Sequence, residues 1–141
     1  MQNFKLSNFK NYLLFLIIVI SIFSLDRISK IKVINSQGDN NKNFINEFIN
    51  IDLIWNTGIG FGLFSSNSTL FYNLITFLIG VVILALIYLS LKSNRTDKLI
   101  YCIIIGGALG NFFDRIKYQA VPDFIDVHYN NFHWFTFNVS D

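Results

Sequence analysis

The sequence predicts a polytopic membrane protein that is mainly α-helical, with a small extracytoplasmic β element at about residues 44–64. Charged residues make up 14% of the 141 residues, well below the roughly 25% that is usual in soluble domains. Hydrophobic residues make up 52%, and many gather in charge-free stretches close to the roughly 20 residues that a helix needs to cross a bilayer. The length fits one domain, so we expect a single integral membrane domain over residues 1–141.

The first predicted span begins with the uncharged stretch 11–25, which follows Lys5 and Lys10. A basic start and an apolar core are also typical of a cleaved signal peptide. No small-residue cleavage site follows, and continuation to Lys30 gives a helix of spanning length, so we predict a retained membrane helix. Asp26 and Lys30 are four residues apart and lie on one face of this helix. They form either an interfacial ion pair or part of a polar site.

A polar, Asn-rich segment without helical periodicity follows at residues 31–52. From residue 44 to 64, large apolar residues alternate with polar residues and glycine, which predicts short strands beside the membrane. Gly58, Gly60 and Gly62 would leave one side of such a strand without side chains. Another backbone or an extended peptide would then be able to approach closely. The spacing of these glycines does not fit a nucleotide-binding loop.

Two further spans are predicted at 70–91, which has no charge, and at 99–113. A basic turn at 92–98 separates them. The basic residues of this turn and of the N-terminus predict that both segments are cytoplasmic. Asp26, the glycine-rich strand and the C-terminal acids would then share the opposite, outer face of the membrane.

The third span has an unusually smooth face. Gly106 and Gly110 form the GxxxG spacing that lets membrane helices pack closely. Gly107, Asn111 and Asp114 point in similar directions at about 100° per residue. This face ends in an amide and an acid, so we expect it to look into the bundle or onto a polar cavity.

Four acids follow in the last third of the chain: Asp114, Asp123, Asp126 and Asp141. Carboxylates where a membrane segment meets water suggest a functional site. Two of them held close together would share a proton, and the ionised member would activate water while the protonated one bonds a scissile carbonyl. The alternatives are solvated loop acids at Asp123 and Asp126, and a helix-dipole partner at Asp141. Asn138 and Asp141 have the spacing of an N-cap and an N3 acid, which predicts a fourth helix beginning near residue 139.

Other chemistries have weaker support. His128 and His133 lack the i, i+4 spacing of a zinc-binding helix, and we expect them to pack at the membrane interface beside Tyr129 and Trp134. The single cysteine, Cys102, lies in an apolar run and is expected to pack there. No metal site, cofactor or disulfide is predicted, and a dispersed net charge of +2 does not indicate a nucleic-acid partner.

The motifs together resemble those of the bacterial lipoprotein signal peptidases. They are DRISK at 26–30, NTGIGFG at 56–62, GGALGNFFDR at 106–115, VPDFID at 121–126 and FNVSD at 137–141. The resemblance implies an aspartic endopeptidase of the bacterial inner membrane, with four spans and both termini cytoplasmic. Such an enzyme removes signal peptides from diacylglyceryl-modified prolipoproteins by cleavage on the amino side of the lipidated cysteine. We expect a monomer among membrane lipids, with its active site at the extracytoplasmic face and no cofactor.

The resemblance also implies roles for individual residues. The catalytic pair falls on Asp123 and Asp141. Supporting or substrate-binding residues fall on Asp26, Lys30, Asn56, Gly58, Asn111, Asp114, Arg115 and Asn138. Asp114 is a rival for the pair, but the adjacent Arg115 suggests a structural ion pair.

Three positions depart from the pattern of the family. Gly60 replaces a usual Ala, and Pro122 and Ser140 replace a usual Val and Ala beside the two catalytic positions. Pro122 is expected to stiffen a turn that carries Asp123, and the hydroxyl of Ser140 is expected to hydrogen-bond Asp141. The fourth membrane helix of the family follows the final Asp, so we expect this peptidase domain to be C-terminally incomplete. A non-enzymatic membrane scaffold or transporter fragment with structural or proton-relaying carboxylates is the alternative, and it does not need Asp123 near Asp141.

Overall fold

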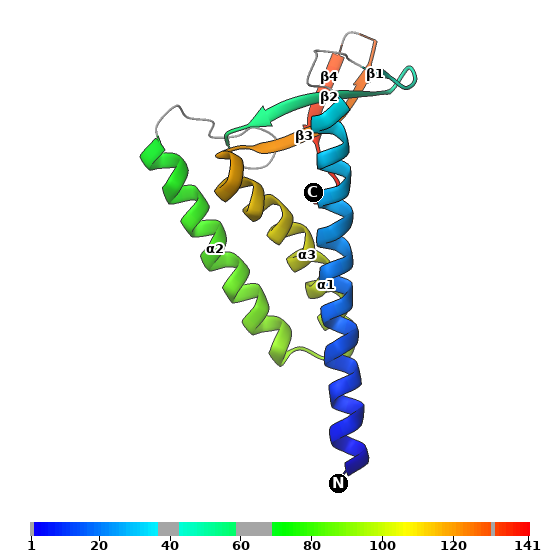
Figure 1. Cartoon of the computed structure of the whole chain (residues 1–141), viewed down its shortest axis with the longest axis vertical. Coiled ribbons are helices and arrows are strands. Elements are labelled where there is room, and N and C mark those ends of the chain that lie inside the picture. Colours follow the sequence, from blue (N-terminus) through cyan, green and yellow to red (C-terminus); the bar gives the residue numbers. More distant parts are fainter. Residues whose placement is uncertain (1, 37–42, 59–68, 131) are drawn as a thin grey trace.

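The computed structural model describes residues 2–36, 43–58, 69–130 and 132–141, and in Figure 1 a small sheet lies across one end of three long helices. The elements are α1 (Gln2–Ser36), β1 (Asn43–Phe44), β2 (Ile49–Asn56), α2 (Thr69–Lys92), α3 (Arg95–Tyr118), β3 (Val121–Tyr129) and β4 (Phe132–Phe137). Helix α3 packs against both α1 and α2 (Figure 1), which makes it the central helix.

The three predicted membrane helices are confirmed. Asn11–Ser36, Thr69–Lys92 and Arg95–Tyr118 are each long and apolar enough to cross a membrane. Their large apolar side chains are widely exposed, as at Leu16, Phe77 and Leu84. Such exposure is unfavourable in water and favourable in lipid.

Two helix boundaries differ from the prediction. Helix α1 continues past Lys30 to Ser36, although residues 31–36 lack a helical pattern. Helix α3 begins at Arg95 rather than 99, so the predicted basic turn is shorter. Asn94 caps it by accepting a hydrogen bond from the backbone amide of Asp97 at 3.0 Å, and the Asp97 carboxylate lies favourably in the first turn.

The small β element is larger than predicted. Strands β1 to β4 form one antiparallel sheet in the order β1-β2-β3-β4. The sequence predicted strands only within 44–64 and a turn around Asp123, whereas β3 and β4 add a hairpin from the C-terminal segment. The predicted strand through Gly60 and Gly62 lies outside the described residues, and Gly58 follows the end of β2.

The GxxxG face of α3 packs directly on α1, as predicted. A Cβ atom added to Gly106 would lie 2.7 Å from Cβ of Ile22, and one added to Gly110 would overlap the carboxylate of Asp26. Only glycine permits this close approach. The packing brings the polar end of α1 against the polar end of α3, directly beneath the sheet (Figure 1).

Candidate active site

A buried network of charges joins the outer ends of α1 and α3. The ammonium of Lys30 lies 2.8 Å from Oδ2 of Asp114, 2.8 Å from Oδ1 of Asp26 and 2.7 Å from Oδ1 of Asn111. Arg27 forms a second ion pair with Asp114. Because two buried carboxylates face two buried cations, the charge of the network is balanced.

The predicted structural ion pair of Asp114 is therefore present, but the predicted partner was wrong. Arg115 instead donates to the carbonyl oxygen of Gly58 at 2.8 Å. Adjacent residues on a helix point about 100° apart, so Arg115 and Asp114 face different elements. Arg27 was missed by the sequence reasoning. Its position beside Asp26 in the DRISK motif, one helical turn from Lys30, was the signal that could have pointed to it.

Asp123 lies at the start of β3 and is almost completely buried. Both of its carboxylate oxygens accept hydrogen bonds, from the amide of Asn138 at 2.6 Å and from the amide of Asn56 at 2.9 Å. Burial raises the pKa of Asp123, and the charge of Asp141 adds to this effect. The two amides, and Lys30 more weakly, oppose it. The net result is a carboxyl that holds its proton to a higher pH than an ordinary aspartate.

Asp141 is exposed and is positioned by two donors. The side chain of Asn111 donates to Oδ1 at 2.8 Å, and the backbone amide of Asn138 donates to Oδ2 at 3.0 Å. Asn138 is thus bonded to Asp123 through its side chain and to Asp141 through its backbone. The structure brings the two predicted catalytic residues to one polar centre.

The capping interpretation of Asn138 and Asp141 fits the same geometry. Oδ1 of Asn138 accepts from the amide of Ser140 at 2.7 Å, while Asp141 accepts from the amide of Asn138. These are the bonds of a capped helix N-terminus. The fourth helix stays a prediction.

Asn111 connects the charge network to Asp141. Its Oδ1 accepts from Lys30 and, at 3.2 Å, from the amide of Asn138, while its Nδ2 donates to Asp141. Lys30 thus fixes the amide of Asn111 by a hydrogen bond, and Asn111 in turn fixes Asn138 and Asp141. Such support restricts side-chain rotation at the reacting groups.

The backbone of Gly58 is held from both sides. Its N–H donates to Oδ1 of Asn56 at 2.8 Å, and its carbonyl accepts from Arg115. Asn56 is also a donor to Asp123, so Gly58 and Arg115 act on the carboxyl through Asn56. The Gly58 N–H is therefore not free to pair with an extended peptide.

Ser140 packs against the glycine face of α3, at Gly107 and Gly110. A Cβ atom added to Gly107 would lie 2.5 Å from the carbonyl oxygen of Ser140, and one added to Gly110 would lie 2.7 Å from the Ser140 hydroxyl. That hydroxyl has no hydrogen-bond partner among the described residues, so the expected bond to Asp141 is not formed. Pro122 is buried within β3 opposite Trp55 rather than in a turn.

The prediction of a solvated loop acid is wrong for Asp126, and for Asp123 as well, since both are buried on β3. Oδ2 of Asp126 is 2.8 Å from Nδ1 of His133. His128 and His133 are cross-strand partners whose rings stack at 5.2 Å. His133 therefore contacts Asp126 and His128, while His128 also lines a cavity with Tyr129 and Trp134. The β3–β4 hairpin brings Asp126, His128 and His133 together, although their spacing in the sequence did not indicate a site.

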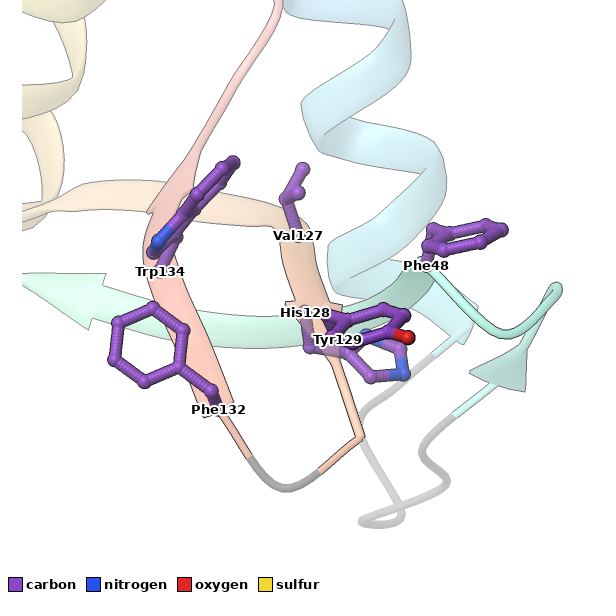
Figure 2. Close-up of a pocket in the computed structure, with 6 residues that line it drawn as sticks. All are labelled: Phe48, Val127, His128, Tyr129, Phe132 and Trp134. Atoms are coloured by element: carbon purple, nitrogen blue, oxygen red, sulfur yellow. The ribbon is translucent and has the colours of Figure 1, made fainter.

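The far end of the same hairpin carries an apolar cavity of about 420 Å³. Figure 2 shows its lining: Phe48, Val127, His128, Tyr129, Phe132 and Trp134. Tyr129, Phe132 and Trp134 are more than 60% exposed, unusual for aromatic side chains in contact with water.

Comparison with known proteins agrees with this architecture. The model of the family described as Signal peptidase (SPase) II matches residues 18–141. The lipoprotein signal peptidase of Pelagibacter ubique (strain HTCC1062) is 46% identical over 136 residues, which are 95% of this chain and 82% of that protein. The lipoprotein signal peptidase of Anaplasma marginale (strain Florida) is 32% identical over 134 residues, 94% of this chain and 78% of that protein.

Two solved structures are also similar. Each is described as a bacterial membrane enzyme structure obtained by the in meso method, one at 2.3 Å and one at 1.9 Å resolution. The TM-scores are 0.73 and 0.70, with 28% and 27% identity. The matches cover 90% of this chain and 77% and 82% of those chains. The chain therefore belongs to the signal peptidase II family, a family of proteases.

Proposed function

We propose that this protein removes signal peptides from diacylglyceryl-modified prolipoproteins and that Asp123 and Asp141 form its catalytic pair. The relatives named lipoprotein signal peptidases support the substrate class. The observation that carries the assignment of the pair is the double contact of Asn138, whose side chain and backbone bond one carboxylate each. Lys30 also joins two carboxylates, Asp26 and Asp114, but as a cation it pairs with the charge of each.

The two carboxyls differ in environment, which suggests different roles. Asp123 is buried and its pKa is raised, so it is suited to hold the shared proton and donate a hydrogen bond to the scissile carbonyl. Asp141 accepts hydrogen bonds through both of its oxygens, so it is suited to be the ionised member that accepts a proton from water.

In this mechanism, water attacks the carbonyl carbon while Asp141 takes its proton and Asp123 protonates the carbonyl oxygen. A tetrahedral diol results. Asp141 then gives its proton to the nitrogen of the lipidated cysteine, the C–N bond breaks, and the hydroxyl proton returns to Asp123. The signal peptide leaves with a carboxyl end and the lipoprotein keeps a free amine.

The charge network supports the pair indirectly. Lys30 bonds Asn111, and Asn111 bonds both Asp141 and Asn138. Asp26 and Asp114 in turn pair with Lys30, and Arg27 pairs with Asp114. We propose that these residues position the amides and do not react.

The proposed location is the bacterial inner membrane, with the N-terminus cytoplasmic and the catalytic pair at the extracytoplasmic face. The basic residues Lys92, Arg95 and Lys98 lie at the end of the bundle opposite the sheet, in accord with the positive-inside tendency. The exposed apolar helix faces would contact lipid, and the exposed aromatics around the cavity of Figure 2 would sit at the membrane interface. We propose a monomer as the working form.

A non-enzymatic scaffold or transporter fragment is not favoured, because relatives that match most of the chain are named as peptidases. The test is processing of a prolipoprotein in bacteria depleted of their own lipoprotein signal peptidase. Asp123→Asn and Asp141→Asn should each abolish processing while the protein stays inserted. Glu47→Gln, an exposed acid just before β2, is the matched control and should process normally. Retained processing in either dyad variant would contradict the assignment.

A further inference from the structure

A second group of reactive side chains lies on the sheet, apart from the proposed catalytic pair. It consists of Asp126, His128 and His133, here called the histidine cluster. One ligand atom from each residue lies within 4.8 Å of those of the other two. On a regular strand such as β3, residues 123 and 126 project from opposite faces, so the cluster and Asp123 are on different sides of the sheet.

The strand register explains how the cluster forms. Asp126 and His128 are two apart on β3 and share one face. On β4, the pairing shifts between Asp126↔Thr136 and His128↔His133, so that two residues of β4 oppose one of β3. His133 pairs directly with His128, so it lies on the same face of the sheet as Asp126 and His128.

The contacts within the cluster are close. Nδ1 of His133 lies 2.8 Å and 3.1 Å from the two oxygens of Asp126, and the two imidazole rings stack within 19° of parallel. Asn50, opposite Asp126 on β2, places its amide 3.4 Å from Nδ1 of His128 and 3.5 Å from Asp126. Asp126 is buried, whereas the side chain of His133 is 53% exposed. The cluster therefore has a fixed acid at its base and an opening to solvent.

We propose that Asp126, His128 and His133 bind a zinc ion. Two imidazole nitrogens and one carboxylate oxygen are a donor set that zinc prefers, with water as a fourth ligand. Ligand atoms around tetrahedral zinc lie about 3.4 Å apart at ordinary bond lengths. The Asp126–His133 pair is already at this scale, and the other ligand atoms, within 4.8 Å, would approach by side-chain rotation when the ion binds. The hydrogen bond between Asp126 and His133 supplies two of the three donors, and His128, whose ring stacks on His133, supplies the third.

The ion would act as a clamp between β3 and β4. β3 begins next to Asp123, and β4 leads directly to Asn138, so the two clamped strands carry the elements of the proposed catalytic pair. Zinc would stabilise the hairpin without touching the reacting carboxylates. The site is thus structural and separate from the proposed peptidase chemistry.

The test is zinc binding by the whole protein in detergent, purified without a histidine tag and treated with a chelator. Isothermal titration with zinc chloride should give one ion per chain. His133→Gln and His128→Ala should each weaken binding at least tenfold, since even outer-shell changes commonly cost 10–100-fold. Glu47→Gln, an exposed acid just before β2, should bind as the parent does. A variant with both Asp123→Asn and Asp141→Asn should also bind normally, which separates this site from the catalytic pair.

Two further readouts make the outcome decisive. Cobalt in place of zinc should give the intense visible absorption of a tetrahedral centre, and His133→Gln should remove it. Zinc should raise the melting temperature of the parent but not of His133→Gln, which alters an exposed ring and leaves the core intact. Absence of zinc binding by the parent, or equal affinity in the histidine variants, would overturn the proposal whatever the peptidase activity.

Discussion

The side-chain amide of Asn138 lies 2.6 Å from Oδ1 of Asp123, and Asn138 is only 2% exposed. Its backbone amide bonds Asp141, so one residue fixes the separation of two carboxylates that come from β3 and from the end of the chain. A catalytic pair needs such a fixed distance, because its two members must act on one water molecule and one carbonyl. A substitution of Asn138 should therefore displace the two carboxylates while leaving both of them in the protein.

We expect Asn138→Ala to lower processing about 100-fold, the order of loss that a displacement of about 1 Å produces. The change removes the side-chain bond to Asp123 but leaves the backbone bond to Asp141 in place. Single-turnover rates with a lipidated peptide would measure the loss. Unchanged single-turnover rates in a folded variant would show that Asn138 does not position the pair.

The pH dependence of the rate should report Asp123. Burial raises the pKa of this group, and the mechanism requires its protonated form, so the rate should fall as pH rises through that pKa. Asn56 donates to the carboxylate and favours its ionised form. Asn56→Ala should thus raise the pKa further and move the alkaline limb of the pH–rate profile to higher pH. A shift of that limb to lower pH would contradict the assignment of Asp123 as the proton-holding member.

The charge network should contribute to stability more than to chemistry. Asp114→Asn leaves Arg27 and Lys30 with one carboxylate between them, and an unbalanced buried charge costs about 3–5 kcal/mol. Denaturation in mixed micelles would measure the loss. Asp97→Asn, at the exposed opposite end of the same helix, is the control and should change stability little. A loss of the same size in both variants would argue against a special role for the buried network.

Much of the membrane architecture could be predicted because its signals are local. Charge-free length revealed three helices, and the spacing of Gly106 and Gly110 revealed the face that packs on α1. The β3–β4 hairpin could not be predicted in the same way, since its stability comes from pairing with β2, a strand distant in sequence. The contacts of Arg27 with Asp114, and of His133 with Asp126, likewise depend on helix packing and on strand register. Their residues were visible in the sequence, but their partners were not.

The glycine face of α3 allows a matched test of close packing. An added methyl at Gly110 would overlap the carboxylate of Asp26 and come within 2.7 Å of the Ser140 hydroxyl, whereas one at Gly80 of α2 would meet only the ring edge of Phe112 at 3.2 Å. We expect Gly110→Ala to destabilise the protein by about 1–3 kcal/mol, as overpacking does. It should also reduce processing, because Asp26 holds Lys30 and Ser140 adjoins Asp141.

Gly80→Ala should be much milder, since a phenylalanine ring can shift by a few tenths of an ångström while a buried ion pair cannot. Both variants add the same methyl group to a membrane helix, so the comparison removes any general effect of helix propensity. Thermal melting and prolipoprotein processing would be measured on the two in parallel. Equal behaviour would mean that α1 and α3 can separate without disturbing the polar centre, and the packing of Gly110 on Asp26 would then have no part in positioning Asp141.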